Sequence, residues 1–88
     1  MAAYEVELTA RARKQYKALD PVIRDRIRRT LLDLADDPAP AQVKALAGSS
    51  GLLRIRVGAW KVIYHLERNQ SRVVIIDIGH HSTVYRRL

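Results

Sequence analysis

The chain contains no cysteine and no apolar run long enough to cross a membrane. The absence of cysteine excludes disulfide bridges and thiolate metal sites, and it is consistent with the cytoplasmic location that we expect. The N-terminal residues lack the apolar core of a signal peptide, so we expect neither export nor a membrane partner. No linker, repeat or low-complexity tract divides the 88 residues. We therefore predict a single domain over residues 1–88, with one core of modest size.

Acidic residues are also scarce, and they are scarcest in the second half of the chain. Residues 1–51 hold nine basic and seven acidic residues, whereas residues 52–88 hold seven basic and only two acidic ones. The formal net charge is +7 and the isoelectric point lies near 10.4. A field of this sign favours a polyanionic partner, either nucleic acid or an acidic protein segment. A basic surface also keeps a small protein in solution, so composition alone leaves both interpretations open.

Two helices are predicted after a short alternating strand over residues 4–8. Thr9 is suited to be the N-cap of the first helix, which we expect to end near Leu19. Asp20 and Pro21 then restart a helix, as its cap and its first residue. The apolar stripe of this second helix has helical spacing and consists of Ile23, Ile27, Leu31 and Leu34. We expect the stripe to face a sheet and the charged residues of the helix to face water.

The segment 52–64 has the alternation of two strands joined by a tight turn. Gly58 and Ala59 occupy the turn, where glycine supplies the positive φ that a type II′ turn needs. This register places Val57 opposite Trp60. The segment is therefore predicted to be a β-hairpin.

The same register gathers three cations on one face of the hairpin. Arg56 lies opposite Lys61, and both project from the face that carries Arg54. Like charges held opposite each other are destabilising, so we infer that this face meets an anion. Taken alone, an Arg-x-Arg pair on a strand is more often solvated surface or protection of a sheet edge.

The last predicted strand contains the apolar β-branched run at residues 73–76 and ends at Gly79. Such a run is typical of a strand buried on both faces. The element order is then one strand, two helices and three strands. This order predicts an α+β fold, in which a helical hairpin packs on one face of a small, mainly antiparallel four-stranded sheet. The other face of the sheet would carry Arg54, Arg56 and Lys61.

Other aromatic and histidine side chains are expected to be structural. Trp60 and Tyr64 fall on the core side of the hairpin, so we expect packing rather than base stacking. His65 shares the face of Lys61 but should be peripheral. His80 and His81 are neighbours and point apart in an extended segment, so they cannot share a metal, and we predict no metal site.

Several short segments along the chain are weak signals of a protein family when taken singly, but their order and spacing together form a specific signal. They are the Leu-Asp-Pro break at 19–21, the Asp-Asp-Pro loop at 36–38, the segment 44–48, the strands 53–58 and 60–64, and the closing segments 78–81 and 84–87. With the opening strand they cover nearly the whole chain. In this arrangement the chain resembles the RelE/ParE superfamily of bacterial toxins, and the RelE branch in particular.

The resemblance implies the toxin of a type II toxin–antitoxin system. Toxins of the RelE branch are metal-independent endoribonucleases that cleave messenger RNA in the decoding site of the ribosome and so inhibit translation. The implied partners are a cognate antitoxin, the 70S ribosome and messenger RNA. Neither a metal nor a small-molecule cofactor is implied.

The resemblance also implies the site residues, because RelE-type toxins act through basic residues on the exposed sheet face and a tyrosine near the C-terminus. The catalytic positions fall on Arg54, Arg56, Lys61, His81 and Tyr85. The positions expected to bind RNA fall on Arg54, Arg56, Lys61, Arg86 and Arg87. Lys61 and His81 stand where arginine is more usual, which puts the rate and preference of cleavage in doubt. A frayed basic tail is an equal alternative for the last two arginines.

Cleavage of RNA without a metal needs groups of these kinds. The 2′-hydroxyl attacks the adjacent phosphorus while a base removes its proton, cations stabilise the phosphorane, and an acid protonates the leaving 5′-oxygen. The arginines and Lys61 suit the cationic role. Tyr85 is a weak base unless neighbouring cations favour its phenolate. His81 can serve as acid or base near neutral pH.

Two rival functions remain open at the level of sequence. The first is a ParE-like inhibitor of DNA gyrase without nuclease activity. The basic cluster and Tyr85 count against it, because gyrase poisons typically lack them. The second is a catalytically degenerate toxin that acts only as an antitoxin-binding module.

Overall fold

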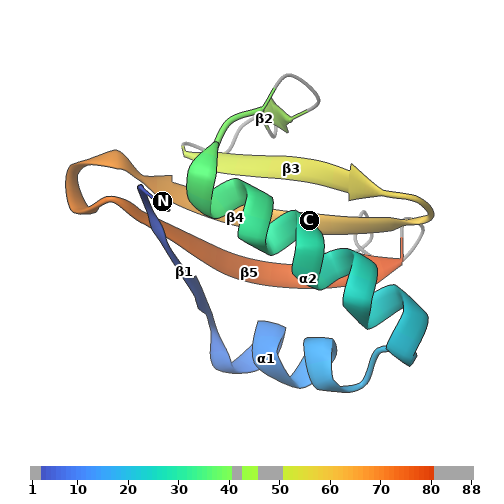
Figure 1. Ribbon diagram of the computed structural model, residues 1–88. Helices are drawn as coiled ribbons and strands as arrows, with labels where there is room; N and C mark the ends of the chain where they lie inside the picture. Colours follow the sequence, from blue (N-terminus) through green and yellow to red (C-terminus); the bar gives the residue numbers. More distant parts are fainter. Residues whose placement is uncertain (1–2, 41–42, 46–50, 81–88) are drawn as a thin grey trace.

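The computed structural model describes residues 3–40, 43–45 and 51–80, which form an α+β fold (Figure 1). The elements in chain order are β1 (Glu5–Leu8), α1 (Ala10–Lys17), α2 (Pro21–Asp36), β2 (Lys44–Ala45), β3 (Leu52–Val57), β4 (Trp60–Glu67), the 3₁₀ turn Arg68–Gln70 and β5 (Arg72–His80). The predicted order of helices and strands is confirmed, with one short strand, β2, added between α2 and the hairpin.

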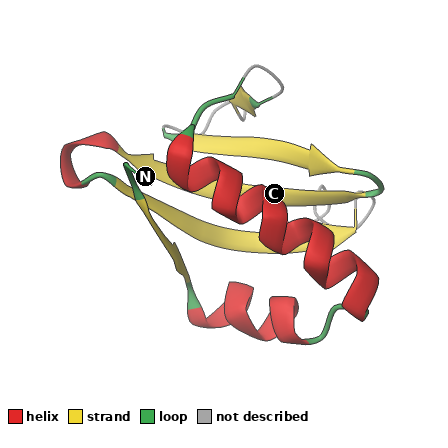
Figure 2. Cartoon of the chain, in the orientation of Figure 1, coloured by secondary structure: helices red, strands yellow, loops and turns green. Residues whose placement is uncertain are grey.

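The strands form one mixed sheet in the order β1-β5-β4-β3-β2. Only β1 and β5 are parallel, and the other neighbours are antiparallel. Helix α2 crosses one face of the sheet, and α1 lies beside the edge formed by β1 and β5 (Figure 2). The predicted fold class is confirmed, although the sheet has five strands rather than four. None of the described helices has both the length and the apolar character needed to cross a membrane.

The hydrophobic core lies between the helices and the sheet. The helices contribute Ala12, Ile27, Leu31 and Leu34, the connection between them contributes Leu19, and the sheet contributes Ile55, Val62, Tyr64, Val73, Ile75 and Ile78. The predicted stripe of α2 is confirmed, because its last three members are buried and Ile23 packs against them at its margin. Alternation along β3 and β4 therefore directs one face of the hairpin into the core and leaves the other face opposite the helices.

The two helices begin where the sequence predicts, by different means. The Oγ1 atom of Thr9 accepts a hydrogen bond of 3.1 Å from the backbone N–H of Ala12, which satisfies one of the open donors of the first turn. Asp20 occupies the cap position of α2, but its side chain makes no capping hydrogen bond. Pro21 has no backbone N–H that would need an acceptor, and its fixed φ favours the first helical position.

Strand β5 is less buried than its apolar sequence predicts. Val73 and Ile75 are fully buried on the helix side, but Val74 and Ile76 are only half-buried. The prediction of burial on both faces is therefore wrong for these two positions, because both helices cover the same face of the sheet. The strand ends at His80, one residue later than predicted.

A bulge interrupts the pairing of β4 with β5. Ile63 lies opposite Asp77 and Tyr64 lies opposite Ile75, so Ile76 is the extra residue of β5. The bulge keeps Ile75 on the core side and leaves Asp77 on the face opposite the helices. A buried carboxylate thus enters the face that carries the hairpin cations.

Helix α1 completes the edge of β5 beyond the end of β1. Strand β1 ends with Leu8 opposite Ile75, and beyond this point the side-chain amide of Gln15 forms the hydrogen bonds to β5. Its Oε1 accepts a hydrogen bond of 2.8 Å from the N–H of Ile78, and its Nε2 donates one of 2.5 Å to Asp77. One side chain therefore supplies the partner that a longer strand would otherwise provide.

Gly58 lies in the turn of the hairpin and has a positive φ of 61°, as predicted. Replacing Gly58 with alanine is expected to cost about 1–2 kcal/mol, because L-residues disfavour this conformation. The new Cβ would also lie about 3.1 Å from the guanidinium of Arg26. Urea unfolding should show the loss. The neighbouring change Ala59→Gly should cost less, because no positive φ occurs at Ala59, and an equal loss in both variants would contradict this explanation.

Candidate functional site

A hollow on the helix-free face of the sheet gathers basic side chains from three strands. Four residues line this cationic hollow of about 250 Å³, namely Lys44, Arg54, Arg56 and Lys61. The predicted register brings Arg56 opposite Lys61, and β2 adds Lys44 opposite Arg54. The structure therefore brings the three predicted hairpin cations together and adds a fourth that the sequence did not indicate.

The four cations differ in their exposure to water. Arg56 and Lys44 are exposed and Arg54 is half-buried, whereas Lys61 is only 6% exposed. Burial of Lys61 differs from the exposed face that the sequence suggested. Its neighbour on the same face, Ile63, is also buried at 1% exposure. A cation in such a position acts in a lower effective dielectric than one in water, so its field on a nearby anion is stronger.

Arg56 is held by the turn that sets the hairpin register. Its Nε donates a hydrogen bond of 2.9 Å to the carbonyl oxygen of Gly58. This bond uses Nε and places the guanidinium beside the turn. The terminal nitrogens of an arginine form the planar fork that matches two phosphate oxygens.

The opposite end of the same face is electrically balanced. The Nε of Arg72 donates a hydrogen bond of 2.6 Å to Glu67, and its guanidinium lies 3.5 Å from Glu7. The hydrogen bond to Glu67 raises the pKa of Arg72 further above its ordinary value. His65 also lies 3.6 Å from Glu67, which agrees with its predicted peripheral place. The concentration of positive charge is therefore a property of the hollow rather than of the whole face.

Asp77 is the acidic side chain closest in register to the hollow. It is buried on the same face as Lys61, two positions before Gly79, which is the partner of Lys61 in β5. Its Oδ1 accepts from Gln15 and lies 3.7 Å from the guanidinium of Arg11. These contacts from α1 compensate a carboxylate that would otherwise oppose an incoming anion.

Tyr64 belongs to the core, as predicted, and is not suited to proton transfer. Its hydroxyl donates a hydrogen bond of 2.6 Å to the carbonyl oxygen of Pro38. Burial, with a smaller contribution from the charge of Asp37, raises the pKa of Tyr64 from 10.0 to about 12. Trp60 packs at the margin of the core and meets His80 edge-on, with ring centroids 5.7 Å apart. Tyr64 therefore ties β4 to the segment that follows α2, and Trp60 ties the hairpin to β5.

The raised pKa of Tyr64 predicts a stability change at alkaline pH. The unfolded chain ionises this hydroxyl near pH 10 and the folded protein near pH 12, so its contribution is present below pH 10 and is lost as pH rises through 12. At pH 8 the Tyr64→Phe variant should be less stable by about 1–3 kcal/mol, because the Pro38 carbonyl loses its partner. Urea midpoints should show the wild-type advantage shrinking above pH 10. A constant difference between the two proteins would contradict this prediction.

The remaining predicted site residues lie outside the described residues. These are His81 and Tyr85, expected to be catalytic, and Arg86 and Arg87, expected to bind RNA. Lys44 is the functional candidate that the sequence analysis missed. Its only signal in the sequence is its basic side chain before the hairpin. Its place opposite Arg54 depends on the pairing of β2 with β3.

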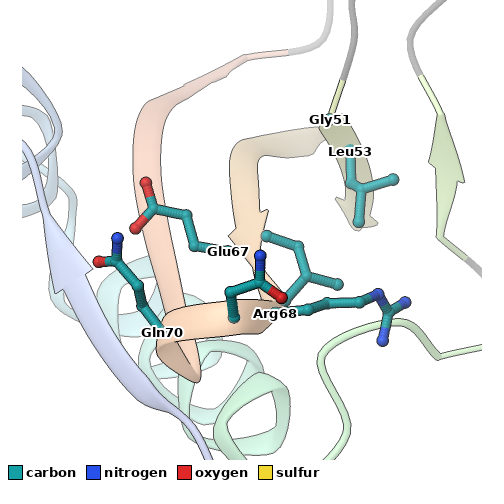
Figure 3. Close-up of a pocket in the computed structure, with 7 residues that line it drawn as sticks. Gly51, Leu53, Glu67, Arg68 and Gln70 are labelled. Carbon is teal, nitrogen blue, oxygen red and sulfur yellow. The ribbon is translucent and has the colours of Figure 1, made fainter.

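A second hollow of about 540 Å³ lies at the other end of the sheet, around the turn between β4 and β5 (Figure 3). It is lined by Gly51, Leu53, Leu66, Glu67, Arg68, Asn69 and Gln70. The side chains of Arg68 and Gln70 extend in opposite directions in this view, so its polar groups do not converge on one point. In the described parts of the chain, no three His, Asp or Glu side chains gather as a metal site. The cationic hollow is therefore the stronger candidate.

A family model described as the ParE toxin of the type II toxin–antitoxin system, parDE, matches residues 6–85. The chain belongs to this toxin family. The predicted membership of the RelE/ParE superfamily is thus confirmed over nearly the full length. A search of curated proteins gives no match.

Solved structures of RelE-type toxins have the same fold. The RelBE2 toxin–antitoxin complex of Mycobacterium tuberculosis contains a chain with 26% identity and a TM-score of 0.80, and the match covers 89% of this chain and 98% of that one. The archaeal RelE–RelB complex of Pyrococcus horikoshii gives 23% identity, a TM-score of 0.79 and coverages of 90% and 96%. The intact RelBE complex of E. coli contains a chain with 21% identity and a TM-score of 0.79, and the match covers 89% of this chain and 96% of that one. This chain, a member of the toxin family named above, therefore has a RelE-like fold.

Proposed function

We propose that this toxin is a ribosome-dependent endoribonuclease that cleaves messenger RNA in the decoding site. The observation that supports the proposal is the cationic hollow, where four basic side chains meet without an acidic residue in its lining. Folding a protein with such a cluster costs energy through like-charge repulsion. A phosphate of the message, bound in the hollow, would offset this cost.

The cations of the hollow suit the charge that develops during cleavage. Attack of the 2′-hydroxyl on phosphorus places additional negative charge on the phosphorane oxygens. Lys61 is held in place by its burial, and Arg56 by its bond to Gly58, so neither needs extensive rearrangement during the reaction. Arg54 and Lys44 lie across the β2–β3 pair and extend the positive surface along the RNA strand. We assign these two residues mainly to binding.

The proton transfers are assigned to Tyr85 and His81, on the resemblance to RelE toxins alone. Tyr85 would take the proton of the 2′-hydroxyl as its phenolate, and His81 would protonate the leaving 5′-oxygen. The two variants Tyr85→Phe and His81→Gln test this division. Each should lower the single-turnover rate, and His81→Gln should also remove a limb of the pH–rate profile. If both variants cleave at the wild-type rate, the assignment is wrong.

The decisive test of the function is primer extension on a message stalled in purified 70S ribosomes. Wild-type protein should cut within the codon of the decoding site, and the same message without ribosomes should remain intact. An intact message on active ribosomes would contradict the nuclease proposal. Normal growth under strong induction without antitoxin would indicate instead a degenerate toxin that only binds its partner.

Inhibition of DNA gyrase is the second candidate, because the matching family is described by the ParE toxin of the parDE system. Purified gyrase supplies the discriminating assay. A gyrase poison should block supercoiling and accumulate cleaved DNA at toxin concentrations that leave ribosome-bound message intact. We expect the reverse for this protein, because the cationic hollow suits a phosphate of a single RNA strand.

We further propose a cognate antitoxin as the regulatory partner. Structures with the same fold are described as complexes of RelE with RelB. An acidic or amphipathic antitoxin segment across the helices or beside the cationic hollow would cover or displace catalytic groups. Affinity capture from the native host should recover a small acidic partner that abolishes message cleavage. Recovery of no such partner would count against this proposal.

A further inference from the structure

Asp77 is a buried carboxylate that the proposed cleavage does not use. It is 5% exposed, on the face of the sheet that carries the cationic hollow. Ile63, its partner in β4, has no polar side-chain group that could compensate it. Burying a carboxylate costs energy unless charges or hydrogen bonds compensate it. The direction from which this compensation comes therefore decides how far Asp77 weakens the positive field of the hollow.

Lys61 is the cation of the hollow that lies closest in register to Asp77. The two residues are diagonal neighbours on one face of the sheet, because Lys61 pairs with Gly79 and Asp77 pairs with Ile63. Diagonal neighbours remain within reach of a side chain as long as that of lysine. Gly79 has no side chain to separate them, and both groups are buried, where opposite charges attract strongly. A close ion pair between them would neutralise the most shielded of the four cations.

The side-chain hydrogen bond of Asp77 directs its carboxylate toward α1 instead. Its Oδ1 accepts a bond of 2.5 Å from Nε2 of Gln15 and lies 3.7 Å from Nε of Arg11. Both partners belong to α1, which lies beside β5 beyond the end of β1 (Figure 2). Compensation of the carboxylate therefore comes from the edge of the sheet, on the side away from the hairpin.

Gln15 is itself held in the orientation that this contact requires. Its Oε1 accepts a hydrogen bond of 2.8 Å from the backbone N–H of Ile78. Because an amide has one acceptor end and one donor end, this bond leaves the donor end for Asp77. The amide binds the carboxylate without adding a charge of its own. Arg11 supplies the opposite charge from the exposed surface of the helix.

We propose that Gln15 is a positioning residue, which holds the carboxylate of Asp77 toward α1 and so keeps Lys61 available to the phosphate of the message. This inference rests on the proposed function, because it takes the hollow as the place where the phosphate is bound and cleaved. Gln15 acts through Asp77 rather than on the message itself. The charge that Lys61 presents in the hollow is thus set partly by a side chain at the edge of the sheet.

Exchanging the acid and the amide tests the role of Gln15. Gln15→Glu keeps an acceptor for the Ile78 N–H but replaces the donor to Asp77 with a like charge. At pH 8 it should turn the Asp77 carboxylate toward Lys61 and lower the single-turnover cleavage rate at saturating toxin by about 10-fold. Gln15→Glu/Asp77→Asn has the net charge of the wild type and restores a hydrogen bond between the two side chains. Its rate should return to within about 2-fold of the wild-type rate.

Asn69→Asp is the matched control for the added charge. It makes the same change from amide to acid at an exposed position in the turn between β4 and β5, at the other end of the sheet from the cationic hollow. Its cleavage rate should fall by less than about 2-fold, because salt screens a distant exposed charge. Equal losses in Asn69→Asp and Gln15→Glu would overturn the proposal, since net charge alone would then explain both.

Thermal unfolding and a crystal structure of Gln15→Glu separate positioning from folding. A folded variant that cleaves slowly, with the Asp77 carboxylate within about 4 Å of the Lys61 Nζ, is the expected result. A variant that melts at a lower temperature but cleaves at the wild-type rate while it is folded would overturn the proposal. Gln15 would then only support the edge of β5.

A measurement without cleavage distinguishes failure of this inference from failure of the proposed nuclease function. Each protein is titrated with a short single-stranded RNA oligonucleotide, and binding is followed by fluorescence anisotropy. Gln15→Glu should bind several-fold more weakly than Asn69→Asp, and Gln15→Glu/Asp77→Asn should bind like the wild type. If these differences occur in a toxin that cuts no message, the role of Gln15 stands and only the nuclease proposal fails. Equal affinities would overturn the role of Gln15 even if the wild type cleaves ribosome-bound message.

Discussion

Replacing Lys61 with methionine is expected to lower the rate of message cleavage on the ribosome by about 100-fold or more. Methionine resembles lysine in length but carries no charge, so the change removes a preorganised cation from the hollow. Because Lys61 is only 6% exposed, no other described cation of the hollow is as shielded from water. Single-turnover cleavage at saturating toxin measures the chemical step directly.

The stability of the same variant separates catalysis from folding. The melting temperature is measured beside the cleavage rate, so that a lower rate is assigned to the chemical step only in a variant that remains folded. Arg68→Met is the matched control, since it removes a positive charge at the far hollow. A variant with Lys61→Met that remains folded and cleaves at the wild-type rate would remove this residue from the proposed mechanism.

The second large effect concerns the contact of α2 with the sheet. Ile27 is fully buried in the centre of the apolar stripe, and Ile27→Ala should destabilise the protein by about 2–5 kcal/mol. For a domain of this size, each kcal/mol corresponds to a change in melting temperature of about 4–8 °C. Thermal unfolding followed by circular dichroism should therefore show a fall of at least about 8 °C.

Helix α2 offers a control on its opposite side. Leu32 is 57% exposed, so Leu32→Ala removes a comparable apolar side chain from the same helix without opening a cavity. Its effect should stay within about 0.5 kcal/mol. Similar losses at both positions would mean that α2 contributes through helix formation rather than through packing on the sheet.

The hairpin was predictable because its determinants are local. Turn chemistry at Gly58 fixes the register, and alternation then assigns each side chain to a face. The pairing of Arg56 with Lys61 follows from these two facts alone. The starts of both helices were predictable for the same reason, since the cap position and Pro21 lie next to the segments they control.

Strand β2 was not predictable, because two residues carry no periodic signal. Lys44 and Ala45 become a strand only by pairing with Arg54 and Leu53 across an intervening loop. Their place in the sheet is a tertiary fact, which local propensity does not determine. The fourth cation of the hollow was missed for this reason.

The burial of Lys61 and the bulge at Ile76 depend on how the layers pack. Alternation gives the face of Lys61 but not the degree to which that face is covered. Beyond the end of β1, the side chain of Gln15 replaces a strand as the partner of Ile78. No residue within β5 announces this, because the cause lies 63 residues earlier in the chain.

The N-terminal strand must wait for nearly the whole chain to be synthesised before it can pair. β1 joins β5 in register, with Glu5 beside Arg72 and Leu8 beside Ile75. β5 also separates β1 from β4, so the sheet is incomplete until this late strand is in place. Closing so long a loop slows folding. We therefore expect the sheet to close only once β5 has been synthesised, so a nascent chain that lacks β5 does not yet have its closed sheet.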